Sequence, residues 1–301
     1  MLYILKKYLE AIECYDEAIK LNPKDANYYN NKGNAFQNLE RYLEAIECFD
    51  EAIKLNPNDV RFFKSKGDIL HNLKRYIEEI ECLEKAIKLD PNNASPYNNK
   101  GSLFYILGRY LEAIECFDEA IKLYSNNARL YNNKGSVFYN MQRYLEAIEC
   151  YDKAIKLNNN DAGTLNDKGH VLNKLGRYSE AVESYDKAIK INPNNARFYN
   201  RKGNNLYLLG RYQEAMQCFD EAIKLESNNP LHFCSRARVF NILRQEEAAL
   251  QDFNRAYNLK QEKQVSGVFT GNEWNLSEEE INFINDVLGR DRIELLQKMQ
   301  I

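Results

Sequence analysis

The sequence lacks the features that mark several large classes of protein. No apolar run approaches the roughly 18 residues that a membrane-spanning helix needs, and the mean hydropathy is −0.63. The 41 Lys and Arg residues nearly balance the 44 Asp and Glu residues, and a net charge of −3 is not typical of a protein that coats phosphate backbones. The first residues, MLYILKK, have no basic segment ahead of their short apolar stretch, so a secretory signal is not expected. These absences predict a soluble, cytoplasmic protein that binds neither membranes nor nucleic acids.

Motifs for catalysis are also missing from the sequence. It contains no GxxxxGK[ST], GxGxxG or GxSxG pattern. The three histidines, His71, His170 and His232, have no carboxylate or thiol at a recognisable spacing and are interpreted as ordinary surface or groove residues. No two cysteines have the CxxC or CxxxC spacing of a zinc site. The sequence therefore predicts no enzyme, no metal and no cofactor.

What the sequence does contain is a repeat with a period of 34 residues. Glycines recur at this step, with alanine in the seventh place: Gly33, Gly67, Gly101, Gly135, Gly169, Gly203 and Ala237. Tyrosines recur at the same step: Tyr8, Tyr42, Tyr76, Tyr110, Tyr144, Tyr178 and Tyr212. A column of alanines begins at Ala18 and ends at Ala256. Several columns in one register indicate one structural unit repeated along the chain.

The residues of each unit predict a pair of helices. In the second half of the first complete unit, Ile46, Phe49 and Ile53 recur at three- and four-residue steps, which is the apolar stripe of an amphipathic helix. Pro57 ends this helix because proline has no N–H to donate to the preceding turn. The glycine column lies inside the first helix, where glycine costs about 1 kcal/mol relative to alanine. We therefore expect the paired helix to approach closely there, with Ala52 on the other side of the contact.

The first complete unit, ANYYNNKGNAFQNLERYLEAIECFDEAIKLNPND, resembles the tetratricopeptide repeat. The match rests on aromatic residues at unit positions 4, 11 and 24, glycine at 8, alanine at 20 and 27, and proline at 32. Glu79 departs from the alanine at position 20, and Ser125, Asn159 and Ser227 depart from the proline. The resemblance implies an all-α fold, a right-handed α-solenoid of antiparallel helix pairs.

The units divide the chain into three parts. Seven repeats cover 26–263, with the bounds 26–59, 60–93, 94–127, 128–161, 162–195, 196–229 and a degenerate 230–263. Residues 1–25 align with the end of a unit, so we expect a truncated first repeat that holds the end of its first helix plus its second helix. Such a start suggests a fragment or a wrongly assigned first residue. Residues 264–301 are expected to form a linker, which includes Trp274, and C-terminal helices that cap the solenoid.

Two further columns carry charged or reactive side chains. Lysine or arginine stands at position 7 of every unit, and we expect each to lay its methylene stem on the next helix while its cation reaches water. Asp50 and Lys54 have the spacing of an i,i+4 ion pair. Successive hairpins are too far apart for disulfides, so the cysteines of position 23 are expected to be thiols that pack as small hydrophobes. These are Cys14, Cys48, Cys82, Cys116, Cys150 and Cys218. Cys234 lies outside this column and is a candidate to face the groove.

The resemblance implies that the first helix of each unit lines a concave surface, with positions 2, 5, 6, 9, 12 and 13 facing inward. The asparagines at position 6 are similar to the asparagine ladder of O-linked N-acetylglucosamine transferases, whose amides hold an extended peptide. A primary amide can pair with any peptide unit because it offers donors and acceptors together. The expected groove residues are Asn31, Asn34, Asn99, Asn133, Arg129, Arg197, Arg201, Asn204, Tyr105 and Tyr139. Alternatively, asparagine is simply abundant in this chain and serves its turns.

These observations favour a non-enzymatic scaffold or adaptor that binds a peptide segment of a partner protein in the groove. Arg197 and Arg201 match the last pair of the carboxylate clamp of chaperone-binding family members, but Asn132, Ser136 and Asp167 depart from it, so a true clamp is not expected. The two arginines still predict a preference for an acidic segment. One alternative is the substrate-recognition part of a glycosyltransferase that lacks its catalytic domain. Another is nucleic-acid binding through the position-7 lysines, which the net charge disfavours.

Overall fold

The computed structural model describes residues 2–265, and every element in that range is an α-helix. Helices of 13 and 14 residues alternate from α2 to α13. The helices are α1 (Leu2–Leu21), α2 (Ala26–Asn38), α3 (Tyr42–Leu55), α4 (Val60–Asn72), α5 (Tyr76–Leu89), α6 (Ala94–Ile106), α7 (Tyr110–Leu123), α8 (Ala128–Asn140), α9 (Tyr144–Leu157), α10 (Ala162–Lys174), α11 (Tyr178–Ile191), α12 (Ala196–Leu208), α13 (Tyr212–Leu225), α14 (Pro230–Ile242) and α15 (Glu246–Val265).

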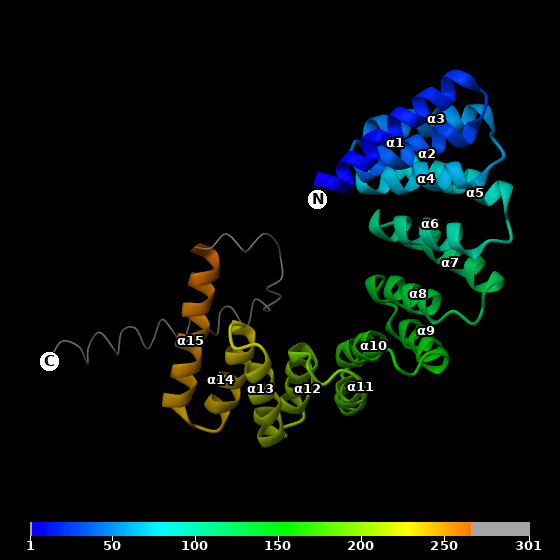
Figure 1. The fold of residues 1–301 in the computed structure, drawn as a ribbon. Helices are drawn as coiled ribbons and strands as arrows, with labels where there is room; N and C mark the ends of the chain where they lie inside the picture. Colours follow the sequence, from blue (N-terminus) through cyan, green and yellow to red (C-terminus); the bar gives the residue numbers. More distant parts are fainter. Residues whose placement is uncertain (1, 266–301) are drawn as a thin grey trace. The chain divides into compact units, whose positions relative to one another are not determined.

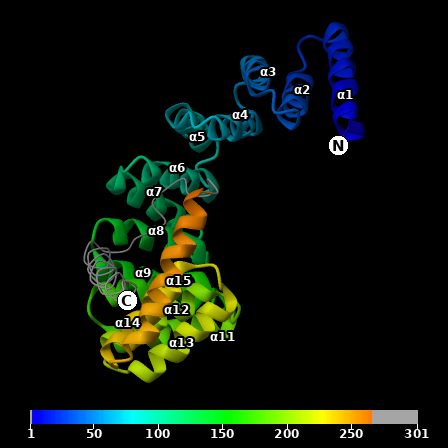
Figure 2. The same ribbon diagram turned by 90° about the vertical axis from the view of Figure 1, so that its left-hand side faces the viewer.

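The helices belong to two compact units. Unit 1 (residues 1–159) contains α1 to α9, and unit 2 (residues 160–301) contains α10 to α15. Within each unit every described helix contacts the helix that follows it, and successive helices run in opposite directions (Figures 1 and 2). The first helices of neighbouring repeats also touch, as α6 touches α8 in unit 1 and α10 touches α12 in unit 2. The predicted solenoid of antiparallel helix pairs is confirmed.

The last residue of each repeat starts the next pair of helices. Its side chain accepts a hydrogen bond from the backbone N–H two residues on, for example from Asn27 to Asp25 at 2.9 Å. This cap satisfies an amide that has no partner inside the helix, and such a cap contributes about 1 kcal/mol. The capping residues are Asp25, Asp59, Asn93, Asn127, Asp161, Asn195 and Asn229.

The turn between the two helices of a repeat depends on one residue with positive φ. Glycine takes this place in three repeats, as at Gly108 with φ of 73°, because glycine enters the left-handed region without strain. In four others a residue with a side chain adopts a φ of 57–59°: Glu40, Lys74, Gln142 and Arg244. The tight turn is therefore kept even where the sequence has no glycine to mark it.

The glycine column packs against an aromatic ring of the second helix. A Cβ atom added at Gly33 would lie 2.6 Å from Cε1 of Phe49, which is inside van der Waals contact. Close approach was expected here, but the partner was not: the ring at position 24 fills the space, and Ala52 does not supply the contact. The exception is Gly67, whose nearest neighbours are 3.9 Å away because Leu83 replaces the ring.

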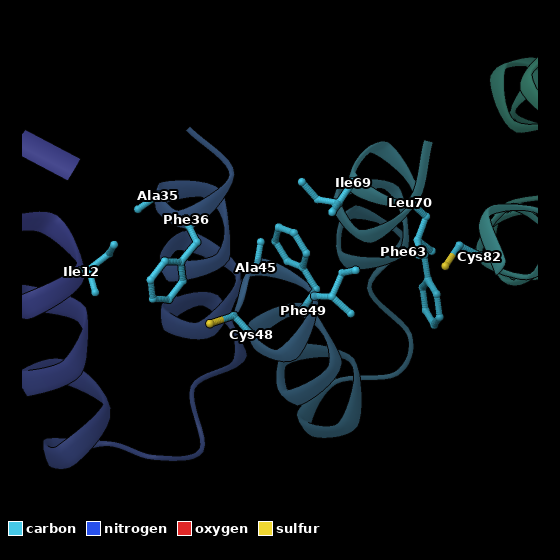
Figure 3. Close-up of a cluster of buried hydrophobic side chains, with 11 residues drawn as sticks. Ile12, Ala35, Phe36, Ala45, Cys48, Phe49, Phe63, Ile69, Leu70 and Cys82 are labelled. Atoms are coloured by element: carbon cyan, nitrogen blue, oxygen red, sulfur yellow. The ribbon is translucent and has the colours of Figure 1, made fainter. Parts of the chain in front are cut away.

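Apolar side chains from both helices of each repeat form the core that joins neighbouring repeats. Figure 3 shows one such cluster in unit 1, where Phe36 and Ala45 of one repeat lie near Cys48 and Phe49. Phe49 is completely buried. Because the same cluster includes Ile69 of the following repeat, the core continues from one repeat to the next.

The position-7 cations do not reach water as expected. Lys66 pairs with Asp50 of the preceding helix pair at 2.5 Å, and only about a fifth of its side chain (21%) is exposed. Asp50 therefore pairs with the next repeat and not with Lys54, the partner that the i,i+4 spacing had predicted. Lys54 pairs with Glu51 at 3.3 Å. The reason is geometric, since position 7 faces the second helix of the preceding repeat across the interface. The same pairing joins Lys32 to Asp16, Lys100 to Glu84, Lys134 to Asp118, Lys202 to Asp186 and Arg236 to Asp220.

The N-terminal segment differs from its expected form. Residues 1–25 were expected to hold the end of a first helix plus a second helix, whereas α1 is one continuous helix over Leu2–Leu21. The sequence before Tyr8 is too short to fold back along α1, so backbone hydrogen bonding continues the helix instead. Of the segment 264–301, which was expected to form a linker and capping helices, residues 264 and 265 end α15 and the rest lies outside the described residues.

Candidate functional site

The ten expected groove residues lie on the first helices of their repeats and are divided between the two units. Seven are in unit 1: Asn31, Asn34, Asn99, Tyr105, Arg129, Asn133 and Tyr139. Three are in unit 2: Arg197, Arg201 and Asn204. The three expected groove arginines are therefore split, with Arg129 in unit 1 and Arg197 and Arg201 in unit 2, and each unit carries its own candidate surface.

The surface in unit 1 has a polar hollow of about 720 Å³ between α6 and α8. Asn99 and Arg129 line this hollow. Asn133 lies beside it, half-buried, and donates from Nδ2 to Oδ1 of Asn98 at 3.0 Å. Asn98 in turn donates to Oδ1 of Asn99 at 3.3 Å. Two of the three expected ladder asparagines are therefore tied into a network within the protein.

The remaining groove residues of unit 1 do not join this network. Asn31 is exposed, and Asn34 is half-buried. Tyr105 packs its ring 6.1 Å from that of Tyr110, and its hydroxyl accepts a hydrogen bond from Asn140 at 2.8 Å. The ring of Tyr139 packs in the same way against the next helix. Tyr105 thus links two neighbouring repeats through Asn140, and the rings of both tyrosines pack within their own repeats.

The surface in unit 2 gathers positive charge on α10 and α12. Arg197 is exposed, whereas Arg201 is half-buried and donates to Oδ1 of Asn166 at 3.1 Å. Burial lowers the pKa of the Arg201 guanidinium, although a hydrogen bond with Tyr185 opposes this. Burial also raises the pKa of Tyr185 to about 12, so the phenol stays neutral beside the guanidinium.

The pKa of His170 reflects the burial and the positive charges of this surface. Its pKa is lowered to about 4, first by burial and then by the nearby charges of Arg201, Lys174 and Arg197. The imidazole is therefore neutral at physiological pH, because burial and then the three neighbouring cations disfavour its charged form. Asp167 is the acidic residue that opposes them, since its charge raises the pKa of Arg201. In such an arrangement an arginine can hold a carboxylate through two parallel hydrogen bonds.

Lys174 was missed as a groove residue, and His170 was expected only as one of three ordinary surface or groove histidines. Both stand at unit positions that the resemblance places on the inner face, positions 9 and 13, and a search of those positions for cations would have identified them. Asn204, which was expected, lies on the same helix as Arg201 and donates to Oδ1 of Asn200 at 3.0 Å. Its amide thus supports the polar network of α12.

Two expectations about reactive side chains are wrong. His232 is not at the surface or in the groove: it is 2% exposed and lies 2.9 Å from Nδ2 of Asn200 and 3.3 Å from Oε2 of Glu226. Cys234 does not face a groove either, because it is 5% exposed and packs with Phe233. Both belong to the degenerate repeat 230–263, where the helix pattern alone did not tell which face is covered.

The described residues contain no group of three or more His, Cys, Asp or Glu side chains that could hold a metal ion. None of the seven cysteines, all of which lie in the described range, forms a disulfide. Burial raises the pKa of five position-23 thiols to about 11: Cys48, Cys82, Cys116, Cys150 and Cys218. A thiol with so high a pKa is a poor nucleophile at neutral pH.

Thiol labelling tests this description of the cysteines. At pH 8, iodoacetamide is expected to modify the exposed Cys14 first and to leave Cys48 and Cys218 largely unmodified. Because the thiolate is the reacting form, raising the pH toward 11 should speed modification of the buried thiols by about tenfold per pH unit while the fold persists. Mass spectrometry of the labelled peptides measures this order. Modification of Cys218 as fast as Cys14 at pH 8 would contradict it.

Models of one repeat family match much of the chain. A model described as TPR repeat matches residues 1–40, 67–105, 101–142 and 169–210. Models described as tetratricopeptide repeat match residues 26–59, 128–161, 196–229 and 150–183. The TPR-repeat matches alone extend over more than half of the 301 residues. A search of curated proteins found no match.

Solved structures with a similar fold are also repeat proteins. The MamA protein is 27% identical, with a TM-score of 0.53, and the match covers 56% of this chain and 92% of MamA. YrrB, described as a TPR protein with an unusual peptide-binding site, is 22% identical, with a TM-score of 0.53 and coverage of 62% and 96%. A tetratricopeptide repeat protein from Parabacteroides merdae is 16% identical, with a TM-score of 0.60 and coverage of 88% and 98%.

In the described part of this chain, no helix is long and apolar enough to cross a membrane.

Proposed function

The chain belongs to the tetratricopeptide-repeat family, and from this premise we propose that it is a non-enzymatic scaffold that binds an acidic peptide segment of a partner protein on unit 2. The observation that carries the proposal is the cluster of Arg197, Arg201 and Lys174 around a neutral His170. The cluster lies on the first helices of two adjacent repeats, so an extended segment crossing from α10 to α12 would meet each cation in turn.

Charge and burial together support an acidic ligand. Arg201 is half-buried, so an ion pair with it is less screened by water and salt than a pair at a fully exposed arginine. Arg197 is exposed and contributes mainly by attracting the ligand during the encounter. The asparagine ladder of unit 1 has less support as a peptide-binding element, because Asn133 already donates its amide to Asn98. We therefore place the acidic segment against unit 2.

Charge reversal at Arg197 tests the proposal. A short fluorescent peptide rich in Asp and Glu is titrated with the full chain, and its anisotropy is followed at low and at physiological salt. Arg197→Glu is expected to weaken binding roughly tenfold or more at low salt, and less at high salt. Arg201→Gln should also weaken binding, with a smaller dependence on salt because that side chain is half-buried.

The matched control is Arg61→Glu. Arg61 occupies the same unit position as Arg197 and is also exposed, but it lies in unit 1 and pairs with Asp59. Its reversal should leave the affinity unchanged. A second readout is the pKa of His170 measured by NMR, which should rise when the acidic peptide binds, because a carboxylate stabilises the imidazolium. A control peptide carries Asn and Gln in place of Asp and Glu. Equal loss of affinity in Arg197→Glu and Arg61→Glu, or equal binding of the control peptide, would contradict the proposal.

A further inference from the structure

The repeat 60–93 of unit 1 departs from the others around one hollow of about 190 Å³. Elsewhere the ring at position 24 rests on the glycine of position 8, but here Leu83 replaces the ring and leaves Gly67 without a close neighbour. Pro96 of the next repeat lines the same hollow, at a unit position where Phe62 and Phe198 stand in other repeats. Two smaller side chains therefore open a space between α4, α5 and α6 that the ring fills elsewhere.

One part of the lining of this hollow is apolar, and the other part is polar and includes Asn93, Ser95 and Asn99. Phe63, Cys82, Leu83 and Ala86 line it together with Gly67. The first four are buried in the core. A space of this size and lining suits a short hydrocarbon chain, since burial of each methylene contributes about 0.8 kcal/mol.

Two carboxylates also line the hollow, one buried and one exposed. Glu79 replaces the small alanine of position 20 and is only 7% exposed. Its Oε2 atom lies 3.0 Å from Nδ1 of His71, and its Oε1 atom has no hydrogen-bond partner among the described residues. The side chain of Asp68 is exposed at the rim and makes no hydrogen bond or ion pair with another described residue. Loss of water around both groups raises their pKa values, because it disfavours the charged forms.

We propose that this hollow binds the side chain of a lysine or arginine from a partner polypeptide. The methylene stem would lie against Phe63 and Leu83. The cation would pair with Glu79 inside the hollow and with Asp68 at its rim. A carboxylate in apolar surroundings is costly unless a cation pairs with it, so a cationic ligand relieves the cost imposed by the buried Glu79, and the exposed Asp68 adds a second negative charge at the rim. The site is separate from the proposed acidic-segment surface, which lies in unit 2.

Lys64 lines the hollow and marks where a cation is accommodated. It is exposed, and its charge lowers the pKa of Asp68, which opposes the effect of burial. Its own stem leaves from α4 beside Asp68, so it reaches the rim and competes with an incoming cation there. Removal of this lysine is therefore expected to strengthen binding.

The test uses n-butylguanidinium, a mimic of the arginine side chain, and n-butylurea, its neutral counterpart. Saturation-transfer NMR on the full chain is expected to show binding of the guanidinium and at least several-fold weaker binding of the urea. A blocked Gly-Arg-Gly tripeptide should bind at least as tightly as the free guanidinium, whereas its failure to bind would overturn a polypeptide as the source of the cation. Equal binding of the urea would overturn the role of the carboxylates.

Variants locate the binding in the hollow. Leu83→Phe restores the ring found in the other repeats and is expected to abolish binding without loss of helical structure. Asp68→Asn and Glu79→Ala should each weaken the guanidinium several-fold, and Lys64→Ala should strengthen it. Helical content by circular dichroism checks the fold of each variant. If Leu83→Phe folds and binds the guanidinium as well as the unchanged protein does, the proposed site is wrong. If Leu83→Phe does not fold, undiminished binding to both Asp68→Asn and Glu79→Ala would show the same.

Discussion

Replacing Gly203 by alanine is expected to destabilise the protein by about 1–3 kcal/mol, whereas the same replacement at Gly67 should be neutral or stabilise it by up to about 1 kcal/mol. A Cβ atom at position 203 would lie 2.6 Å from Cε1 of Phe219, a ring that is completely buried and has no room to move. At position 67 the nearest atoms are 3.9 Å away. A methyl group added there makes only ordinary van der Waals contacts. The higher helix propensity of alanine then decides whether the free energy of unfolding rises or falls.

Hydrogen exchange of the amides in α12 and α13 measures the first effect, and exchange in α4 and α5 measures the second. This readout is needed because repeats can open separately, so that one global transition would average them. A combined variant, Phe219→Leu with Gly203→Ala, serves as the control, since it recreates the leucine of the 60–93 repeat opposite the new methyl group. It should recover part of the loss caused by Gly203→Ala. Equal destabilisation at Gly67 and Gly203 would show that the ring contact does not decide the outcome.

Replacing Glu79 by alanine is expected to stabilise the protein at neutral pH by about 1–3 kcal/mol, the cost of holding a polar group in apolar surroundings. Burial raises the pKa of this carboxyl in the folded state, so its protonated form is the one that folding favours. Stability from such a group is present at low pH and is lost as the pH rises through the raised pKa. The advantage of the alanine variant should therefore be largest at neutral pH, shrink as the pH falls through the raised pKa, and be lost below about 4, where the carboxyl is protonated in the unfolded chain as well.

Glu78, the preceding residue, is a matched control with the opposite sign. It is exposed, and its hydrogen bond with Arg75 lowers its pKa. Glu78→Ala should thus destabilise the protein slightly at neutral pH, and this difference should disappear in acid. Urea titrations of both variants between pH 3 and pH 7 test the pair. A pH-independent difference for Glu79→Ala would mean that packing, rather than ionisation, determines its effect.

Much of the fold followed from the spacing of residues along the chain. The columns of glycine, alanine and aromatic residues predicted helix pairs, and the helices begin and end at recurring unit positions, as in α3 from Tyr42 to Leu55. Such patterns succeed because each repeat uses the same backbone and the same apolar face. The free thiols of position 23 were also predictable, since the period places them too far apart to pair.

The candidate sites were less accessible to sequence reasoning. Arg197 and Arg201 were expected from the resemblance, but their grouping with His170 and Lys174 joins residues of two repeats about 30 positions apart in the sequence. The hollow beside Glu79 was not foreseen either. The replacement of alanine by Glu79 was visible, yet its meaning depended on Leu83 and Pro96 meeting in space.

By itself the sequence determined the period, the pairing of helices and the residues available on each face, because local propensity and apolar spacing repeat every 34 residues. Only the tertiary structure decided what those side chains contact. The position-7 lysines illustrate the difference: one pattern was compatible with cations in water or with cations paired across repeats, and Lys66 pairs with Asp50. The physical reason is that burial and charge pairing depend on the distance between atoms of different helices, which packing sets and sequence spacing does not.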